Sequence, residues 1–232
     1  MYDMILLDPP WRYNSKGTSK KFKVGAENHY PTMPMNDLRT LPIQQIANPE
    51  GSLCLMWVTW PFLSEGLELM QAYGFRYRTT ACVWVKLEKK GFQHPTDDKN
   101  YADDAAYVWY HPTQLFHKRF FGVGSYAVSN TEFMLLGISG KKNKFAYKSR
   151  KHVKSQLIHA PLSDHSRKPA ESYQLIDQIW GTDHKRIELF CRRPYEGWDG
   201  IGNQIESGEQ LDIREGLQRL IEQNTSSLDI PA

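Results

Sequence analysis

Five short apolar runs limit what this chain can fold into more than any other feature of its sequence. They cover residues 4–7, 52–59, 79–86, 132–138 and 186–191. Nearly unbroken apolar runs of this length are typical of strands that are covered on both faces, as in parallel sheets. Segments with helical spacing alternate with them, at residues 36–46 (interrupted by Pro42), 61–73, 169–180 and 210–223. The alternation predicts an α/β fold with a mostly parallel central sheet and helices on both faces.

The composition fits a folded, reducing-compartment protein. Hydrophobic residues make up 40% and aromatic residues 12% of the 232 positions, which excludes a disordered chain. The three cysteines are far apart in the sequence, so we expect neither a disulfide framework nor a metal site of cysteine and histidine ligands. The longest apolar stretch, residues 53–63, is too short to cross a bilayer, and the first residues do not resemble a signal peptide. We therefore expect a cytoplasmic protein without a membrane partner.

The net charge of +3 conceals two oppositely charged regions. Residues 199–232 hold seven acidic residues and two Arg, a net charge of −5, which leaves +8 on residues 1–198. Seven Lys and Arg lie within residues 141–154, whereas no Asp or Glu occurs from 133 to 163. This basic run is either a solvated surface loop or a phosphate-binding patch. In the second interpretation the basic side chains hold a nucleic-acid strand, and we name Lys20, Lys21, Lys141 and Lys142 as candidates.

The tetrapeptide Asp8-Pro9-Pro10-Trp11 directly follows the first predicted strand, at the end where open α/β sheets bind ligands. Proline has no N–H group, so we expect the two prolines to expose carbonyls without competing donors. An ionised Asp only accepts hydrogen bonds, and Trp offers a flat surface for stacking. Together they predict a pocket for a planar base whose two amino hydrogens go to the Asp8 carboxylate and the Pro9 carbonyl. The plain alternative is a turn in which the prolines merely end the strand.

The sequence resembles the MT-A70-like adenine methyltransferases, whose catalytic motif is DPPW. Other segments resemble the family in the same order along the chain, at residues 29–33, 55–59, 83–86, 122–126, 132–137, 165–169, 187–192 and 202–204. The resemblance implies a Rossmann-like methyltransferase fold. It also implies transfer of a methyl group from S-adenosylmethionine to the exocyclic amino nitrogen of adenine in DNA or RNA.

Roles for individual residues follow from the resemblance. The catalytic residues would be Asp8, Pro9, Pro10 and Trp11, and Tyr13 and Tyr30 would close the adenine pocket. The cofactor-binding residues would be Asp8, Lys168, Glu188, Phe190, Arg192, Asn203 and Gln204. Lys168 would meet the methionine carboxylate, which suits an ammonium point charge. Asn203 and Gln204 have the donors and acceptors that ribose hydroxyls need.

The chain departs from the family pattern at one place. Larger members have an acidic segment before the DPPW strand that contacts the cofactor adenine. Here only seven residues precede Asp8. We expect a partner for the cofactor adenine near residues 158–165 instead.

We expect residues 1–206 to form the catalytic domain and residues 207–232 an acidic amphipathic helix and tail, which packs on the domain or forms a homodimer contact. We favour DNA as the substrate because the chain is compact and has no added RNA-binding module. The alternatives are the same reaction on RNA and, in a different class, a non-catalytic nucleic-acid-binding subunit. Residues 87–120 are either a segment that recognises the target sequence or an ordered surface insertion.

Overall fold

The computed structural model describes residues 1–12, 32–88, 122–123, 128–141, 145, 153, 155–163, 167–206 and 209–226. Five of the candidate residues lie outside these ranges: Tyr13, Lys20, Lys21, Tyr30 and Lys142. Most of the 87–120 segment and most of the basic run 141–154 also lie outside them.

The chain divides into two compact units. The first contains Met1–Ala81, Met134–Ala146 and Thr182–Ala232, and the second contains Cys82–Phe133 and Tyr147–Gly181. The main sheet has seven strands in the order β7-β3-β6-β2-β1-β8-β9. Its strands are β1 (Met4–Leu7), β2 (Ser52–Val58), β3 (Arg76–Leu87), β6 (Thr131–Ser139), β7 (Leu157–Pro161), β8 (Arg186–Leu189) and β9 (Asp199–Ile201). A short antiparallel pair is formed by β4 (Gly122–Val123) and β5 (Val128–Ser129).

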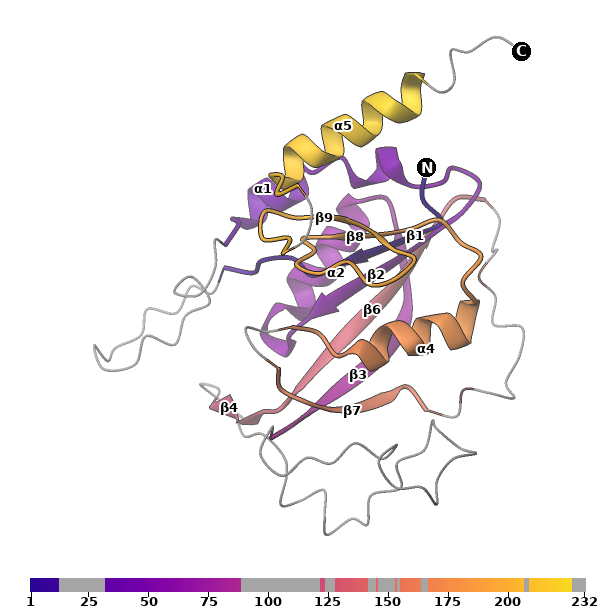
Figure 1. Cartoon of the computed structure of the whole chain (residues 1–232). Helices are drawn as coiled ribbons and strands as arrows, with labels where there is room; N and C mark the ends of the chain where they lie inside the picture. The colour runs from indigo at the N-terminus through magenta and orange to yellow at the C-terminus, as the bar shows by residue number, and fades with distance from the viewer. Residues whose placement is uncertain are drawn as a thin grey trace. The chain divides into compact units, whose positions relative to one another are not determined.

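In the first unit, β1 lies between β2 and β8 and runs parallel to both (Figure 1). Every residue of β1, β2 and β8 is buried, as the apolar runs predict for strands covered on both faces. β9 extends the sheet in parallel with β8. The end of β6 lies beside the start of β2, since a Cβ on Gly140, just after β6, would lie 2.6 Å from the Cα of Gly51, just before β2. β6 therefore runs antiparallel to its neighbour β2.

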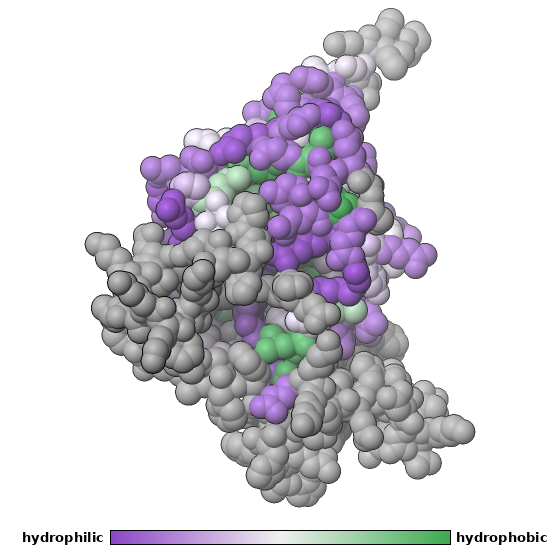
Figure 2. All heavy atoms as spheres, turned by 60° about the vertical axis from the view of Figure 1, so that its left-hand side comes forward, coloured by the Kyte–Doolittle hydropathy of each residue, from purple (hydrophilic) through white to green (hydrophobic). Residues whose placement is uncertain are grey.

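Helices of the first unit pack on this part of the sheet. They are α1 (Met35–Arg39), the 3-10 helices η2 (Ile43–Ile46) and η3 (Trp60–Phe62), α2 (Leu63–Ala72) and α5 (Ile213–Ser226). α2 packs against β2, whereas α5 packs against β9 and η2 (Figure 1). The outward face of α5, at the top of Figure 2, is mostly hydrophilic, whereas Ile213, Gly216 and Leu217 are buried. This confirms packing of the C-terminal helix on its own chain, and the homodimer contact stays a prediction.

The second unit is built on the parallel pair β3 and β7, with Val83 opposite Leu157 and Leu87 opposite Pro161. The indole N–H of Trp84 donates to the Ala160 carbonyl at 2.9 Å and ties the two strands together. The Lys86 N–H donates to the Asn130 carbonyl at 2.9 Å, so the start of β6 lies beside the end of β3. Helix α4 (Ala170–Trp180) packs against β7 (Figure 1).

The mostly parallel α/β architecture is confirmed, with local differences at element ends. The 36–46 segment divides into α1 and η2 on either side of Pro42, which cannot donate a helical hydrogen bond. The last helix begins at Ile213 rather than at Gln210, because the Asp212 carboxylate accepts the Arg214 N–H at 2.9 Å and caps it. The division at residues 206 and 207 stays a prediction. Within the described residues, none of the helices has the length and apolar composition needed to span a membrane.

Candidate active site

Asp8 lies where β1 ends, between the ends of two neighbouring strands. Leu7 is paired with Met56 of β2 and with Leu189 of β8. Continuing both registers by one residue places Asp8 between Trp57 and Phe190. Asp8 is half-buried and Pro9 is buried. The motif is therefore at the carboxyl edge of the sheet, as predicted.

The two prolines form a tight turn whose carbonyls already accept one hydrogen bond each. The Trp11 N–H donates to the Pro9 carbonyl at 2.8 Å, and the Met33 N–H donates to the Pro10 carbonyl at 3.0 Å. The expectation that the Pro9 carbonyl has no competing donor is wrong, because the donor comes from Trp11 rather than from a proline. A carbonyl oxygen has two lone pairs, so Pro9 can still accept a second hydrogen bond from a ligand.

Trp11 supports the motif by packing inside the protein. Its ring is stacked on Phe62, with centroids 5.1 Å apart and planes 15° apart, and only 6% of the residue is exposed. Phe62 therefore occupies one face of the indole. The Trp11 Nε1 atom is buried and has no hydrogen-bond partner in the part of the chain that the structure describes.

The predicted cofactor residues of the first unit lie at the ends of β8 and β9. Leu189 is paired with Ile201, so the residues that follow these two leave the sheet at the same edge as Asp8. Glu188 is 8% exposed, Asn203 is exposed, and Phe190, Arg192 and Gln204 are half-buried. The ends of β1, β8 and β9 thus bring to one edge of the sheet six residues from three segments of the sequence: Asp8, Glu188, Phe190, Arg192, Asn203 and Gln204.

The backbone after β8 has an unusual conformation. Phe190 has φ +63°, a left-handed value that bulky side chains rarely adopt. The Cys191 N–H then donates to the Ile201 carbonyl at 2.9 Å, which holds the two strand ends together. A Cβ on Gly202 would overlap the Cys191 carbonyl oxygen, so only glycine allows this close approach. Strained conformations of this kind cluster at ligand-binding sites.

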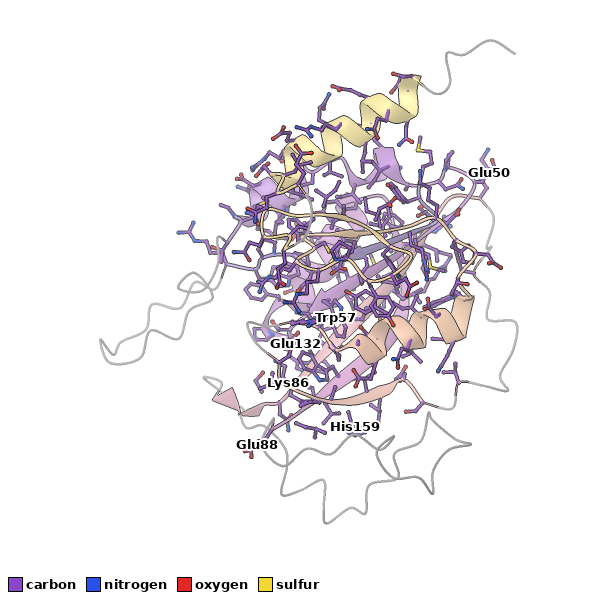
Figure 3. The ribbon with its side chains drawn as sticks, viewed as in Figure 1. Glu50, Trp57, Lys86, Glu88, Glu132 and His159 are labelled. Carbon is purple, nitrogen blue, oxygen red and sulfur yellow. The ribbon has the colours of Figure 1, made fainter. Side chains whose placement is uncertain are left out.

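In the second unit, Lys168 belongs to a buried charge cluster. The Lys168 Nζ lies 3.2 Å from Oε2 of Glu132, and the Lys86 Nζ lies 2.6 Å from Oε1 of Glu132. Figure 3 labels Glu132 and Lys86, which lie close together. The three side chains are only 10%, 14% and 10% exposed for Lys168, Lys86 and Glu132. Glu132 therefore fixes the position of both ammonium groups.

Burial and the two lysines act on Glu132 in opposite directions. Burial disfavours the charged carboxylate and would by itself raise the pKa of Glu132. The positive charges of Lys168 and, next, Lys86 outweigh burial and hold the pKa of Glu132 below its ordinary value. The carboxylate is therefore ionised at neutral pH, and the cluster is a true ion-pair network.

Sequence reasoning missed Glu132 and Lys86. For the segments that hold them, the sequence predicts only strands that resemble the family. The signal in the sequence was Glu132 itself, a charged residue at the start of the apolar run 132–138 and the last acid before the acid-free stretch. A charge within a buried strand requires a partner, but the sequence does not show which residue supplies it.

Of the basic-run candidates, Lys141 is described, and it is exposed. The ring of Phe145, in the same run, is buried and packs against His184, with centroids 5.2 Å apart. The structure contains no group of three His, Cys, Asp or Glu that could hold a metal ion within the described ranges.

A mostly parallel sheet with one antiparallel strand, β6, and a polar carboxyl edge at β1, β8 and β9 defines a Rossmann-like methyltransferase fold. Comparison with known families agrees with this class. The model of the MT-A70 family matches residues 2–104 and 100–204, and the chain belongs to this family.

Individual relatives are similar over most of this chain. The type II methyltransferase M.MunI of Mycoplasma sp is 28% identical over 235 residues, covering 92% of this chain and 84% of its own length. An MT-A70-like N(6)-adenosine-methyltransferase of Arabidopsis thaliana is 24% identical over 231 residues, covering 99% of this chain and 27% of its own. The human N(6)-adenine-specific methyltransferase METTL4 is 24% identical over 217 residues, covering 91% of this chain and 39% of its own length. The chain thus spans well under half of the plant and human proteins.

Replacing Glu132 with Gln should leave two largely buried ammonium groups without their counter-charge. We expect the free energy of unfolding to fall by about 3–5 kcal/mol, measured by urea denaturation at neutral pH. Because the pKa of Glu132 is lowered on folding, its contribution is complete above the ordinary carboxyl pKa of about 4 and is lost as the pH falls through the folded-state pKa. The difference between wild type and variant should therefore shrink on acidification.

The control is Glu215→Gln, which breaks an exposed ion pair with Arg219 on α5. Exposed pairs contribute little, so this variant should unfold like the wild type. Equal stability of the Glu132→Gln variant and the wild type at neutral pH would show that the cluster contributes nothing to folding.

Replacing Gly202 with Ala should force the ends of β8 and β9 apart, because the new methyl group meets backbone. We expect a loss of about 1–3 kcal/mol, observed as a lower Tm in thermal denaturation. Gly200→Ala, two residues earlier within β9, is the matched control. A Cβ there would lie 3.0 Å from Pro194 Cγ and 3.1 Å from Cys191 Sγ, contacts with side chains that can shift. A smaller Tm change for Gly202→Ala than for Gly200→Ala would contradict the role assigned to Gly202.

Proposed function

We propose that this chain transfers a methyl group from S-adenosylmethionine to the exocyclic amino nitrogen of adenine in DNA. The observation that carries the proposal is the complete Asp8-Pro9-Pro10-Trp11 motif at the end of β1, in a chain of the MT-A70 family. Members of this family are in general S-adenosylmethionine-dependent methyltransferases.

The preference for DNA is supported by the similarity to M.MunI, a type II methyltransferase, over 84% of that protein's length. The Arabidopsis relative named an adenosine methyltransferase supports the RNA alternative, but this chain spans only 27% of it. The two candidate substrates differ in the 2′-hydroxyl group, which an RNA-specific site must accommodate.

Asp8 and Pro9 hold the adenine amino group in the proposed site. The Asp8 carboxylate accepts one amino hydrogen, and the second lone pair of the Pro9 carbonyl accepts the other. Both bonds make the nitrogen more electron-rich and favour a tetrahedral geometry. Pro10 and Trp11 shape the pocket, with Trp11 fixed against Phe62, and Tyr13 and Tyr30 close it.

Positioning contributes more than proton abstraction in this mechanism. The bound cofactor supplies an already activated methyl group, so the protein chiefly orients the nucleophile. Asp8 does not need to be a strong base, because the amino nitrogen becomes far more acidic once it is cationic. The Asp8 carboxylate then stabilises that developing positive charge at close range.

The donor set fits the cofactor. In the second unit, Lys168 is an ammonium group held in place by Glu132, and it binds the methionine carboxylate in our proposal. In the first unit, the amides of Asn203 and Gln204 and the carboxylate of Glu188 suit ribose hydroxyls. Phe190, Arg192 and Asp8 complete the proposed cofactor residues.

DNA binding is proposed to use basic side chains for the phosphates: Lys20, Lys21, Lys141 and Lys142. In a duplex the target adenine must leave the stack, at a cost of about a few kcal/mol. A non-catalytic nucleic-acid-binding subunit is the second candidate. Calorimetry with S-adenosylmethionine separates the two, because only the enzyme needs to bind it.

Replacing Asp8 with Ala, or with Asn, should lower the rate of methyl transfer by about 100-fold or more while the protein stays folded. Asn keeps the size of the side chain but removes its negative charge, so both variants lose the stabilising carboxylate. The assay measures labelled methyl groups in DNA, and circular dichroism checks the fold. Asp37→Ala, which removes an exposed acid of α1, is the control and should keep full activity. Wild-type rates in both Asp8 variants would refute the mechanism.

Incubating unmodified DNA and unmodified RNA with labelled cofactor tests the substrate directly. Nucleoside analysis should find the label in N6-methyldeoxyadenosine from DNA. A label confined to N6-methyladenosine from RNA would establish the alternative substrate, and a label at another base would overturn the assignment of the Asp8 pocket to adenine.

A further inference from the structure

Trp60 is an exposed aromatic residue that follows β2 at the same edge of the sheet as the DPPW motif. It begins η3 two residues after the end of β2, and 52% of it is exposed. Leu63, three residues later, is 37% exposed. Among the described residues only five large hydrophobic side chains are exposed, and these two lie within four consecutive positions. We call residues 60–63 the apolar ledge.

The apolar ledge is attached to the motif by a ring contact. β1 and β2 are parallel neighbours, so the chain leaves both strands at the same edge. Phe62 then turns inward and stacks on Trp11, with centroids 5.1 Å apart. Trp60 is therefore two residues from a ring that touches the proposed catalytic motif.

The ledge has a rigid support. The Phe62 N–H donates to the Thr59 carbonyl at 2.9 Å, which closes the turn of η3. α2 follows directly and is packed closely on β2, since a Cβ on Gly66 would lie 2.8 Å from Val58 Cγ2. Leu69 and Met70 of α2 are fully buried. An aromatic side chain on such a support is ordered before a ligand arrives, which lowers the entropic cost of binding.

A positively charged residue, Arg12, lies next in sequence to the ring that contacts the apolar ledge. Arg12 follows Trp11 directly and is exposed. Arg12 and Trp60 are thus one and two residues from the stacked pair of Trp11 and Phe62. A guanidinium and an indole suit a nucleic-acid strand together, because the first contacts a phosphate and the second stacks on a base.

We infer that Trp60 stacks on the base next to the target adenine on the same strand, while Arg12 contacts an adjacent phosphate. This inference rests on the proposed function. When the adenine leaves its stack, the neighbouring base loses a stacking partner. In our inference Trp60, about half of which is exposed, replaces that partner. Stacking on an aromatic side chain tolerates any base, so Trp60 would hold the strand open without selecting the sequence.

The test uses the wild-type chain first to find its own substrate. Methylation of methylation-free genomic DNA, followed by sequencing of modified positions, defines a short duplex that contains the target adenine. Two further duplexes replace the base on either side of the adenine with an abasic site. KM for DNA and kcat are then measured for wild type, Trp60→Ala and Trp60→Phe.

We expect Trp60→Ala to raise KM for the intact duplex by about 5- to 150-fold, with a smaller change in kcat. Trp60→Phe keeps a stacking ring and should recover most of this loss. On the duplex that lacks the stacked base, Trp60→Ala and wild type should have the same KM. Tyr77→Ala is the matched control, since Tyr77 is 46% exposed in the same unit, near the start of β3, and should change nothing.

Three results would overturn the inference: an unchanged KM in Trp60→Ala, a loss of equal size on intact and abasic duplexes, or a loss that follows a change in subunit number by sedimentation. The last would show that a second copy of the chain covers the ledge. Absence of methyl transfer by the wild type would overturn the proposed function and the inference with it. Methyl transfer that is insensitive to Trp60→Ala would overturn the inference alone.

Discussion

The parallel pairing of β1 with β2 on one side and β8 on the other is the constraint on which the proposed site depends. Leu7 is fixed opposite Met56 and Leu189, so the residues that follow these three leave the sheet together. A slip of one residue would turn the Asp8 side chain to the other face of the sheet. Such a slip is costly because all four β1 residues are buried, and it would bring a flanking acid, Asp3 or Asp8, into the buried part of the strand in place of an apolar residue. The hydrophobic core therefore sets the position of a polar group.

The strands that the sequence predicts well are those with continuous apolar runs, namely β1, β2 and β8. The two strands of the main sheet that it does not predict are short or only partly covered. In β7 just Ile158 and Ala160 are buried, so its sequence has no apolar run that would distinguish it from the basic segment before it. β9 has three residues and is a strand only because it is paired with β8. Local sequence predicts strands whose own residues are apolar and buried, whereas the formation of strands at the edge of a sheet depends on pairing with their neighbours.

The same distinction applies to the site. Asp8, Pro9, Pro10 and Trp11 are consecutive, so the sequence alone identifies them as one motif and indicates their shared chemistry. The Lys86–Glu132 pair joins residues 46 positions apart and exists only because β3 and β6 lie side by side in the second unit. No spacing rule connects these residues. The hydrogen bond from the Trp11 N–H to the Pro9 carbonyl is likewise not predictable from the sequence, because a turn hydrogen bond depends on backbone angles rather than on residue type.

The turn at Pro9 has a consequence for which bases can enter. With the Trp11 N–H already bonded to the Pro9 carbonyl, that amide is no longer available as a donor toward a ligand. The prolines have no N–H, and an ionised Asp8 cannot donate either. The two groups that hold the amino group in our proposal, the Asp8 carboxylate and the Pro9 carbonyl, thus both accept hydrogen bonds. A keto oxygen, which guanine has where adenine has its amino group, would face the lone pairs of both groups and find no hydrogen there to bind. Discrimination between the two purines would then come from repulsion by the same two groups that hold the adenine amino group.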